Sequence, residues 1–248
     1  MKKLERNPEK NPGKKTEKET GKNPEKKPEK RMEKNRKTEK KPEKRLGRKS
    51  EAGKKQPPVN LHEKEAWRPG NMLYPLPAVM VSCARPGQRP NIITVAWAGT
   101  TCSSPAMVSI SVRRERYSYD IIKETGEFVI NLVPKDLVYA TDYCGVRSGR
   151  DVDKFKEMKL TPLPSGHIGA PGIKESPVNI ECKVKAEVPL GSHDMFVAEV
   201  MGVTVDKAFI DKNGKFHLND IGLTAYSHGE YFELGEKIGS FGYSVKKK

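Results

Sequence analysis

The chain has 248 residues, and its 47 Lys and Arg against 32 Asp and Glu give a formal net charge of +15. Residues 1–58 alone hold 23 Lys and Arg against 10 Asp and Glu, a net charge of +13, which leaves +2 for residues 59–248. The charge therefore excludes little about the fold, because it belongs to the N-terminal tail. Residues 59–248 contain the Val, Ile, Phe, Tyr and Trp and can bury a full core, so the sequence predicts one domain behind an appendage.

The tail repeats a short polar unit, Asn-Pro-Glu-Lys at 7–10 and 23–26, with Lys-Pro-Glu-Lys variants at 27–30 and 41–44. Frequent prolines interrupt any helix, and almost no apolar side chain offsets the entropy of ordering, so residues 1–58 are predicted to be disordered. One interpretation is an arm that binds nucleic acid or an anionic surface, and the other is a solvated extension. The interspersed glutamates favour the second.

The positions of the cysteines and the hydropathy of the sequence indicate the cellular compartment of the protein. The four cysteines are far apart and form no CxxC pair, which argues against a zinc site or a disulfide framework and favours small buried side chains in a reducing compartment. The sequence has no run approaching the roughly 20 apolar residues of a membrane span. We expect a soluble, cytoplasmic protein without a bound metal.

From residue 59 onward the pattern becomes strand-like in chain order. Period-two alternation is clearest in 180–188, where Cys182, Val184 and Ala186 alternate with charged side chains, as expected of a half-buried strand. Strands are predicted at 78–83, 91–98, 107–112, 127–133, 180–188 and 195–205, a hairpin turn at Asn213-Gly214 within 208–218, and short helices at 118–124 and 135–143. This order indicates a mainly β domain, a barrel with short covering helices.

Several cofactor and catalytic motifs are absent from the sequence. The glycines at 166, 169 and 172 do not form the GxGxxG of a dinucleotide-binding βαβ unit, and residues 47–54 miss the phosphate-loop spacing. Asp211 to Gly214 opens like a calcium loop but lacks the later acidic ligand. The histidines do not have the spacing of metal ligands, and the sequence contains no recognisable Ser/His/Asp pattern of a catalytic triad. Nothing indicates hydrolysis or metal chemistry.

Small hydroxyl and basic side chains gather around two of the predicted strands. They are Thr94, Thr100, Thr101, Ser103, Ser104, Arg113, Arg114, Arg116 and Ser118. Hydroxyls, backbone N–H groups and a guanidinium bind phosphate, and strand-edge amides suit the rim of a flat heterocycle. Spacing alone favours the other interpretation, in which the hydroxyls complete a turn and the arginines are solvated.

At this point the sequence resembles the flavin reductase-like, FMN-binding split-barrel family, and within it the flavoredoxin-like group. The matching segments run in family order across residues 59–248 and leave the tail without a counterpart. They are Tyr74-Pro75-Leu76-Pro77, PNIITVAWAGTTCSSPAMVSISV, RERYSYDIIKETGEFVINL, CGVRSGRDVDKF, IECKV, GSHDMFVAEV and YFELGEKIGSFGYSVKK. The resemblance implies a split β-barrel and a homodimer, with noncovalent FMN near the subunit interface.

The resemblance also implies positions for the FMN. Residues expected along the flavin ring are Ile93, Thr94, Val95, Ala96 and Trp97, and those expected beside the ring and ribityl chain are Cys102, Ser103 and Ser104. Arg116 and Ser118 are favoured for the phosphate, with Arg113 as the alternative arginine and Lys154 as a further candidate. His193 matches a histidine that lies near the nicotinamide in some members, although Ser192 replaces the aspartate of that turn.

A bound flavin itself carries the chemistry, which explains why no catalytic acid, base or nucleophile is found in the sequence. The leading hypothesis is an FMN-dependent oxidoreductase that takes reducing equivalents from NAD(P)H or a protein donor and passes them to flavin, a metal or a redox partner. The alternative is a flavoredoxin-type electron carrier without its own NAD(P)H site. A hypothesis of another class is a nucleic-acid or anionic-surface binder acting through the tail.

Overall fold

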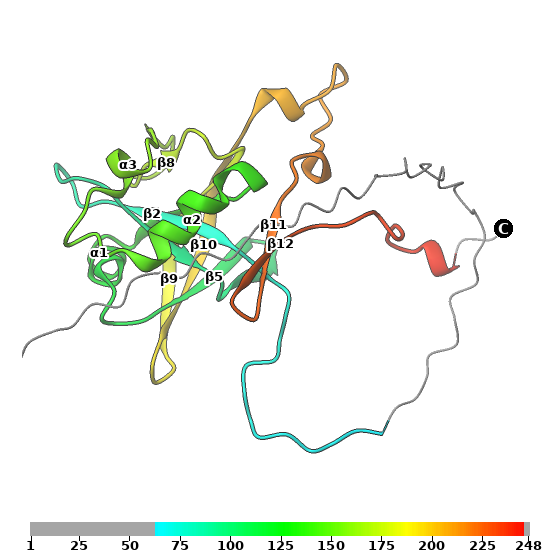
Figure 1. Ribbon diagram of the computed structural model, residues 1–248. Helices are drawn as coiled ribbons and strands as arrows, with labels where there is room; N and C mark the ends of the chain where they lie inside the picture. The colour runs from blue at the N-terminus through cyan, green and yellow to red at the C-terminus, as the bar shows by residue number, and fades with distance from the viewer. Residues whose placement is uncertain (1–62, 246–248) are drawn as a thin grey trace, which may run out of the picture. The chain divides into compact units, whose positions relative to one another are not determined.

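The computed structural model describes residues 63–245, so the predicted disorder of the tail lies outside the described residues. The described part is mainly β, as predicted (Figure 1). Its strands are β1 (Leu76–Pro77), β2 (Val79–Cys83), β3 (Asn91–Val95), β4 (Ala98–Ser103), β5 (Ala106–Val112), β6 (Glu127–Leu132), β7 (Pro162–Leu163), β8 (Gly172–Ile173), β9 (Val178–Pro189), β10 (Asp194–Val205), β11 (Thr224–Ser227) and β12 (Glu230–Glu233). The helices are α1 (Tyr117–Thr125), α2 (Val138–Val146) and α3 (Lys154–Glu157).

Seven of these strands form one antiparallel sheet in the order β3-β2-β6-β9-β10-β5-β4. The twelve-residue strands β9 and β10 lie at its centre, and their pairing shifts register between Val197 and Ala198 and again between Val200 and Gly202. Such bulges increase the local bend of a sheet and help it curl into a half-barrel. A three-stranded sheet, β1-β11-β12, and the small pair β7-β8 complete the strands.

The strand β2 is buried on both faces, and its alternating side chains enter two different cores. Val79, Val81 and Cys83 belong to the core inside the curled sheet, together with α1. Met80 belongs to a second core, which α2 and α3 cover from the other side. Because successive side chains of a strand point to opposite faces, one buried strand connects both cores.

Glycines determine where α1 ends and how closely α2 packs on the sheet. The helix α1 ends at Gly126, whose left-handed backbone (φ 67°) lets its N–H donate to the Ile122 carbonyl. The helix α2 packs on β2 and β3 (Figure 1). A Cβ at Gly145 would lie 3.2 Å from the Thr94 Cβ, so the glycine permits this close approach of helix and strand.

A buried asparagine joins four strands of the sheets. The Asn131 side-chain amide on β6 donates to the Met80 carbonyl and the Ser82 hydroxyl of β2. Its Oδ1 accepts from the Ile173 amide of β8 and from the Asn179 side chain of β9. Asn131 has no solvent exposure, so the bonds satisfy a polar group that burial alone would destabilise.

The structure corrects some predicted elements. The strand expected at 91–98 ends at Val95, and the chain turns at Ala96 and Trp97, where the Ala98 amide donates to the Ala96 carbonyl. The turn near Asn213-Gly214 is confirmed, but only one bridge, Ile210 to Phe216, follows it. The six-residue strand β4 was not predicted, because the segment expected as one strand at 91–98 is in fact divided between β3 and the start of β4. Strands β1, β7, β8, β11 and β12 and helix α3 were not predicted either, because each is four residues or fewer.

Two sequence predictions concern cysteines and membrane spans. Cys83, Cys144 and Cys182 are buried and free, as predicted, and burial raises the pKa of their thiols to about 12, 11 and 12 respectively. Cys102 is partly exposed, so the prediction of a buried side chain is wrong for this cysteine. Among residues 63–245, no helix is both long and apolar enough to cross a membrane.

Candidate functional site

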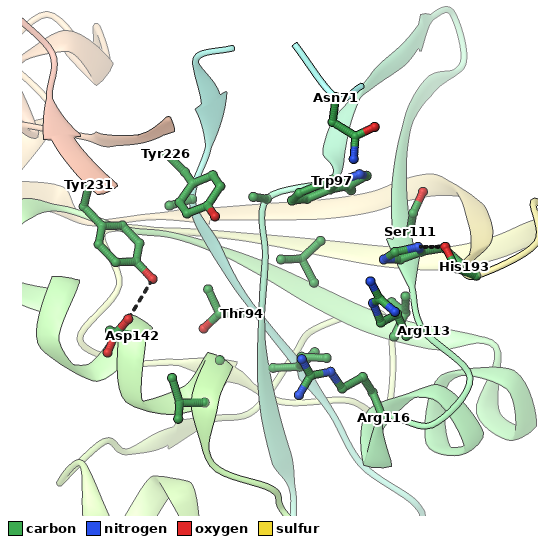
Figure 2. Close-up of a pocket in the computed structure, with 18 of the residues that line it drawn as sticks. Asn71, Thr94, Trp97, Ser111, Arg113, Arg116, Asp142, His193, Tyr226 and Tyr231 are labelled. Atoms are coloured by element: carbon green, nitrogen blue, oxygen red, sulfur yellow. Dashed lines mark hydrogen bonds between the residues drawn. The ribbon is translucent and has the colours of Figure 1, made fainter. Parts of the chain in front are cut away.

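A cavity of about 520 Å³, which we call the main cavity, opens between β3, the end of β5, α2, the β9–β10 turn and the β11–β12 hairpin (Figure 2). This volume lies within the roughly 300–1,000 Å³ of small-molecule sites. The cavity is lined by Asn71, Ala78, Ile93, Thr94, Val95, Ala96, Trp97, Ser111, Val112, Arg113, Arg116, Asp142, Gly145, Val146, Leu190, Ser192, His193, Tyr226 and Tyr231.

The middle of the main cavity is formed by β3 and the turn that follows it. β3 is an edge strand that pairs only with β2, so the backbone groups of alternate residues face away from the sheet. The Ile92 carbonyl faces this way, since Lys154 donates to it, and the backbone groups of Thr94 share that edge. The Thr94 hydroxyl donates to the Thr141 carbonyl of α2. The edge therefore offers backbone hydrogen bonds to a flat ligand.

Trp97 and His193 form a stacked pair at one side of the main cavity. Their rings are 6.2 Å apart and nearly parallel, at 6°, and the indole is 38 % exposed. The Ser192 hydroxyl lies 2.9 Å from His193 Nδ1. Burial and the nearby charge of Arg113 lower the pKa of His193 below its usual value, which favours a neutral imidazole at pH 7.

Arg113 and Arg116 give the same side of the cavity its positive charge (Figure 2). Arg113 has a loose ion pair with Glu115 at 3.7 Å. Arg116 stands at the N-cap of α1 with extended backbone, and no side chain caps the helix there. The first-turn amides and the helix dipole add to the attraction for an anion at this point.

A smaller cavity of about 150 Å³, which we call the basic cavity, shares Ile93, Arg116 and Gly145 with the main cavity. It is lined by Asn91, Ile93, Glu115, Arg116, Tyr117, Ser118, Cys144, Gly145, Arg147, Ser148, Gly149, Arg150 and Lys154. Four of these side chains are cationic and one is acidic. The buried Ser118 hydroxyl accepts a 2.7 Å hydrogen bond from Asn91.

Lys154 is buried in the wall of the basic cavity, with only 4 % of its surface exposed. Its ammonium group donates to the carbonyls of Ile92 and Cys144, at 2.6 and 2.7 Å. An ammonium has three protons, so one donor remains beyond these two bonds. Burial lowers the pKa of Lys154 to about 8, and the charge of Arg116 acts in the same direction.

A buried carboxylate holds two walls of the main cavity together. Asp194 accepts a bidentate pair from Arg114, with Nε to Oδ2 at 2.9 Å and Nη2 to Oδ1 at 2.8 Å. The Tyr119 hydroxyl of α1 donates to the same carboxylate at 2.5 Å. These bonds hold the pKa of Asp194 down at about 2. Arg114 follows Arg113 and Asp194 follows His193 in the chain. The ion pair between Arg114 and Asp194 therefore fixes the backbone that carries Arg113 and His193.

The side of the cavity away from the arginines is aromatic and acidic (Figure 2). The Tyr231 hydroxyl donates to Asp142 Oδ1 at 3.2 Å, and the rings of Tyr226 and Tyr231 are 5.9 Å apart. Burial, together with the charge of Asp142, raises the pKa of Tyr231 to about 12. Tyr231 therefore remains a neutral hydrogen-bond donor at physiological pH.

The structure brings most of the predicted site residues together. Ile93, Thr94, Val95, Ala96, Trp97, Arg113, Arg116 and His193 line the main cavity, and Ser118 and Lys154 line the basic cavity. Cys102, Ser103 and Ser104 lie on the hairpin that joins β4 to β5 and line neither cavity. Beyond Trp97 the chain continues into β4, the far edge of the sheet, and this separates the three residues from β3. Contact of any of these residues with a flavin stays a prediction.

Several lining residues were missed from the sequence. Ser111 alternates on a predicted strand, but nothing in the pattern distinguished its face as functional. Asp142 and Gly145 fall near the end of a predicted helix, and Tyr226 and Tyr231 come from β11 and β12, far along the chain. Only tertiary pairing brings these elements to β3, so no local spacing could have found them.

The comparisons with known proteins place the chain in a family. Residues 72–235 match the model of the flavin reductase-like domain. The protein therefore belongs to the flavin reductase-like family, whose fold binds flavin.

Two relatives and one solved structure illustrate the similarity. The structure of the flavoredoxin of Desulfovibrio vulgaris (Miyazaki F) is 32 % identical, with a TM-score of 0.69 over 74 % of this chain and 100 % of that one. An uncharacterized protein of Archaeoglobus fulgidus is 33 % identical over 64 % of this chain and 88 % of its own length. A ferric-chelate reductase (NAD(P)H) of the same organism is 26 % identical over 53 % of this chain and 78 % of its own length. Some relatives are thus oxidoreductases.

Proposed function

We propose that the protein binds FMN across the main and basic cavities and acts as an oxidoreductase. The observation that carries the proposal is the junction of the two cavities at Arg116. On one side lies an edge strand with aromatic neighbours, which suits a flat ring, and on the other a small cationic hollow, which suits a phosphate. A bound FMN would supply the redox chemistry by accepting and releasing one or two electrons.

The phosphate would be held by the groups of the basic cavity. The Arg116 guanidinium can donate two hydrogen bonds to a phosphate, and the third proton of the Lys154 ammonium is available for another. The Ser118 hydroxyl can donate while accepting from Asn91. The volume of about 150 Å³ is large enough for a phosphate group.

The ring would lie along Ile93 to Trp97, in line with the family resemblance. Backbone groups on the open edge of β3 can bind its polar rim, and Gly145 keeps α2 from crowding Thr94. The neutral amides of this edge orient a ring without adding charge. Arg113 ranks behind Arg116 as a phosphate ligand, because it lines the main cavity but not the basic cavity. It stays the alternative arginine.

For the electron donor we propose a nicotinamide nucleotide, with a protein donor as the alternative. His193 stacks on Trp97 at the rim of the main cavity, where a neutral imidazole can contact a nicotinamide ring. The similarity to a flavoredoxin supports the second candidate, an electron carrier without its own nucleotide site. Anaerobic mixing with NADH and NADPH separates the two, because rapid bleaching of the bound flavin by either nucleotide favours the reductase.

We propose that the working unit is a homodimer, in a reducing cytoplasmic compartment.

The test of the proposal is a pair of binding titrations on Arg116→Ala. Loss of charge-assisted bonds to a phosphate costs about 1.5–3 kcal/mol, so FMN should bind roughly tenfold to a hundredfold more weakly while riboflavin binds as before. Arg85→Ala is the matched control, because Arg85 pairs with Glu124 at the other end of α1. Protein that is colourless and takes up no added FMN refutes the proposal. Equal weakening of both ligands would show that Arg116 supports the fold.

A further inference from the structure

The last described segment of the chain, residues 234–245, carries large apolar side chains that nothing in residues 63–245 covers. We call it the C-terminal arm. Leu234 and Tyr243 are about 60 % exposed, Val245 is 81 % exposed, and Ile238 and Phe241 are fully exposed. The last backbone hydrogen bond to the sheet runs from the Leu234 amide to the Leu223 carbonyl. Five such side chains in water are unfavourable, which points to a surface that covers them.

A receiving surface exists on the same molecule, beside Trp97. A cavity of about 580 Å³, which we call the apolar cavity, lies between residues 70–76 and the strands β4 and β5. It is lined by Gly70, Asn71, Met72, Leu73, Tyr74, Leu76, Trp97, Ala98, Gly99, Ser109 and Ser111. No charged side chain lines it, in contrast to the main and basic cavities. Met72 and Leu73 are 67 % and 83 % exposed, so this surface also lacks a cover.

The backbone beside the apolar cavity is also unpaired. β4 is the edge strand of the seven-stranded sheet and bonds only to β5, so its outer N–H and C=O groups are open to a further strand. Between Leu234 and Phe241 the arm has no helix or strand, and its own backbone groups need partners. An extended segment laid along an open strand edge satisfies both sets of groups.

We propose that the C-terminal arm of each copy packs into the apolar cavity of a second copy, with Ile238 and Phe241 as the anchoring side chains. This inference rests on the proposed homodimer and gives it a specific contact. The contact lies beside the main cavity, because the apolar cavity shares Asn71, Trp97 and Ser111 with it. In its own chain the arm leaves both anchors fully exposed, so it does not fill its own cavity. The seven residue-to-residue steps from Leu234 to Phe241 span about 23–25 Å when extended, enough to reach a neighbouring subunit.

The buried area is of the order that a stable dimer needs. An aromatic side chain buries about 150–250 Å², and a specific interface totals about 1,200–2,000 Å². In a two-fold dimer the contact occurs twice, so two arms of five apolar side chains and the two cavity walls they cover reach that range. Both surfaces belong to this chain, which makes a second copy the occupant that the observations favour.

The first test measures the oligomeric state of the full chain by sedimentation equilibrium. The wild-type protein should be a dimer, and the double variant Ile238→Ser, Phe241→Ser should raise the dimer dissociation constant by roughly a hundredfold or more, because hydrophobic anchors dominate such interfaces. Leu218→Ser is the matched control, since Leu218 is an exposed apolar residue outside both surfaces. Circular dichroism should show unchanged folding. A dissociation constant within twofold of wild type overturns the inference but leaves the FMN site standing.

The second test identifies the occupant directly. A photo-crosslinking amino acid at position 241 is introduced into isotopically light copies, which are then mixed with heavy copies that lack it. Crosslinks from light position 241 to heavy peptides covering 70–76 or 97–111 support the exchange. Crosslinks only within the light copy show that the arm folds onto its own chain, and a wild-type monomer shows that there is no dimer to explain. Either result overturns the inference.

Discussion

The lowered pKa of Lys154 predicts that FMN binding depends on pH. Lys154 faces the basic cavity with a pKa near 8, so at pH 7 its ammonium is charged and at pH 9.5 it is mostly neutral. A bound phosphate dianion favours the charged form and raises this pKa, so FMN binding above pH 8 requires uptake of a proton. Binding is strongest below the pKa of the free protein and weakens as pH rises through it.

The size of the effect follows from one proton. With a pKa of about 8, roughly 3 % of Lys154 is protonated at pH 9.5, so FMN affinity should fall by up to about thirtyfold between pH 7 and 9.5. The Cys83 and Cys144 thiols have pKa values of about 12 and 11 and remain protonated, and the lowered pKa of His193 keeps it neutral.

The assay is fluorescence titration of FMN and riboflavin at constant ionic strength across this pH range. Riboflavin carries the same ring without the phosphate, so its affinity should stay nearly flat. Lys154→Met should bind FMN more weakly and without the pH dependence, whereas Lys156→Met, an exposed lysine on the same short helix, should behave as wild type. An FMN affinity that is flat from pH 7 to 9.5, or a riboflavin curve of the same shape, would refute the reasoning.

Two further substitutions test the walls of the cavities. Asp194→Asn removes the charge that holds Arg114, so the melting temperature should fall and FMN should bind roughly tenfold more weakly. Calorimetry measures the melting temperature, and titration measures the FMN affinity. An unchanged FMN affinity would show that the pair of Arg114 and Asp194 does not position the arginines of the cavity. Gly149→Ala would place a Cβ 2.0 Å from Asn91 Oδ1 and should lower the free energy of unfolding by about 1–3 kcal/mol in urea denaturation. Gly99→Ala, with open space around it, is the control, and an equal loss in both would contradict the steric account.

The long alternating strands could be predicted from the sequence because one face of each is buried and the other is polar. β9 and β10 are of this kind, and so is β5. The break after Val95 could not be predicted, because residues 92–98 are apolar apart from Thr94 and contain no Gly or Pro, and the turn depends on the pairing of β4 with β5. The strands β11 and β12 carry too few residues for a period to show.

Some residues of the candidate site could be predicted from the sequence and others could not. The segments around Thr94 and Arg116 were predicted because the resemblance singled them out, and they do meet at one cavity. Asp142 and Tyr231 were not found, since a hydrogen bond between residues 89 apart has no local signature. Lys154 was predicted as a phosphate candidate, but its two bonds to carbonyls and its lowered pKa depend on burial that only the fold reveals.

The hydrogen bonds of Asn131 have a consequence for which alternative structures the chain can adopt. A slip of β6 by one residue against β2 or β9 would turn this amide to the opposite face of the sheet and leave buried partners on three strands without a bond. Apolar strands of similar side chains tolerate such slips, whereas a fully bonded amide penalises every register but one. Because β3 takes its own position from β2, one buried asparagine, outside either cavity lining, ensures that Ile93 and Thr94 reach the main cavity in the native register.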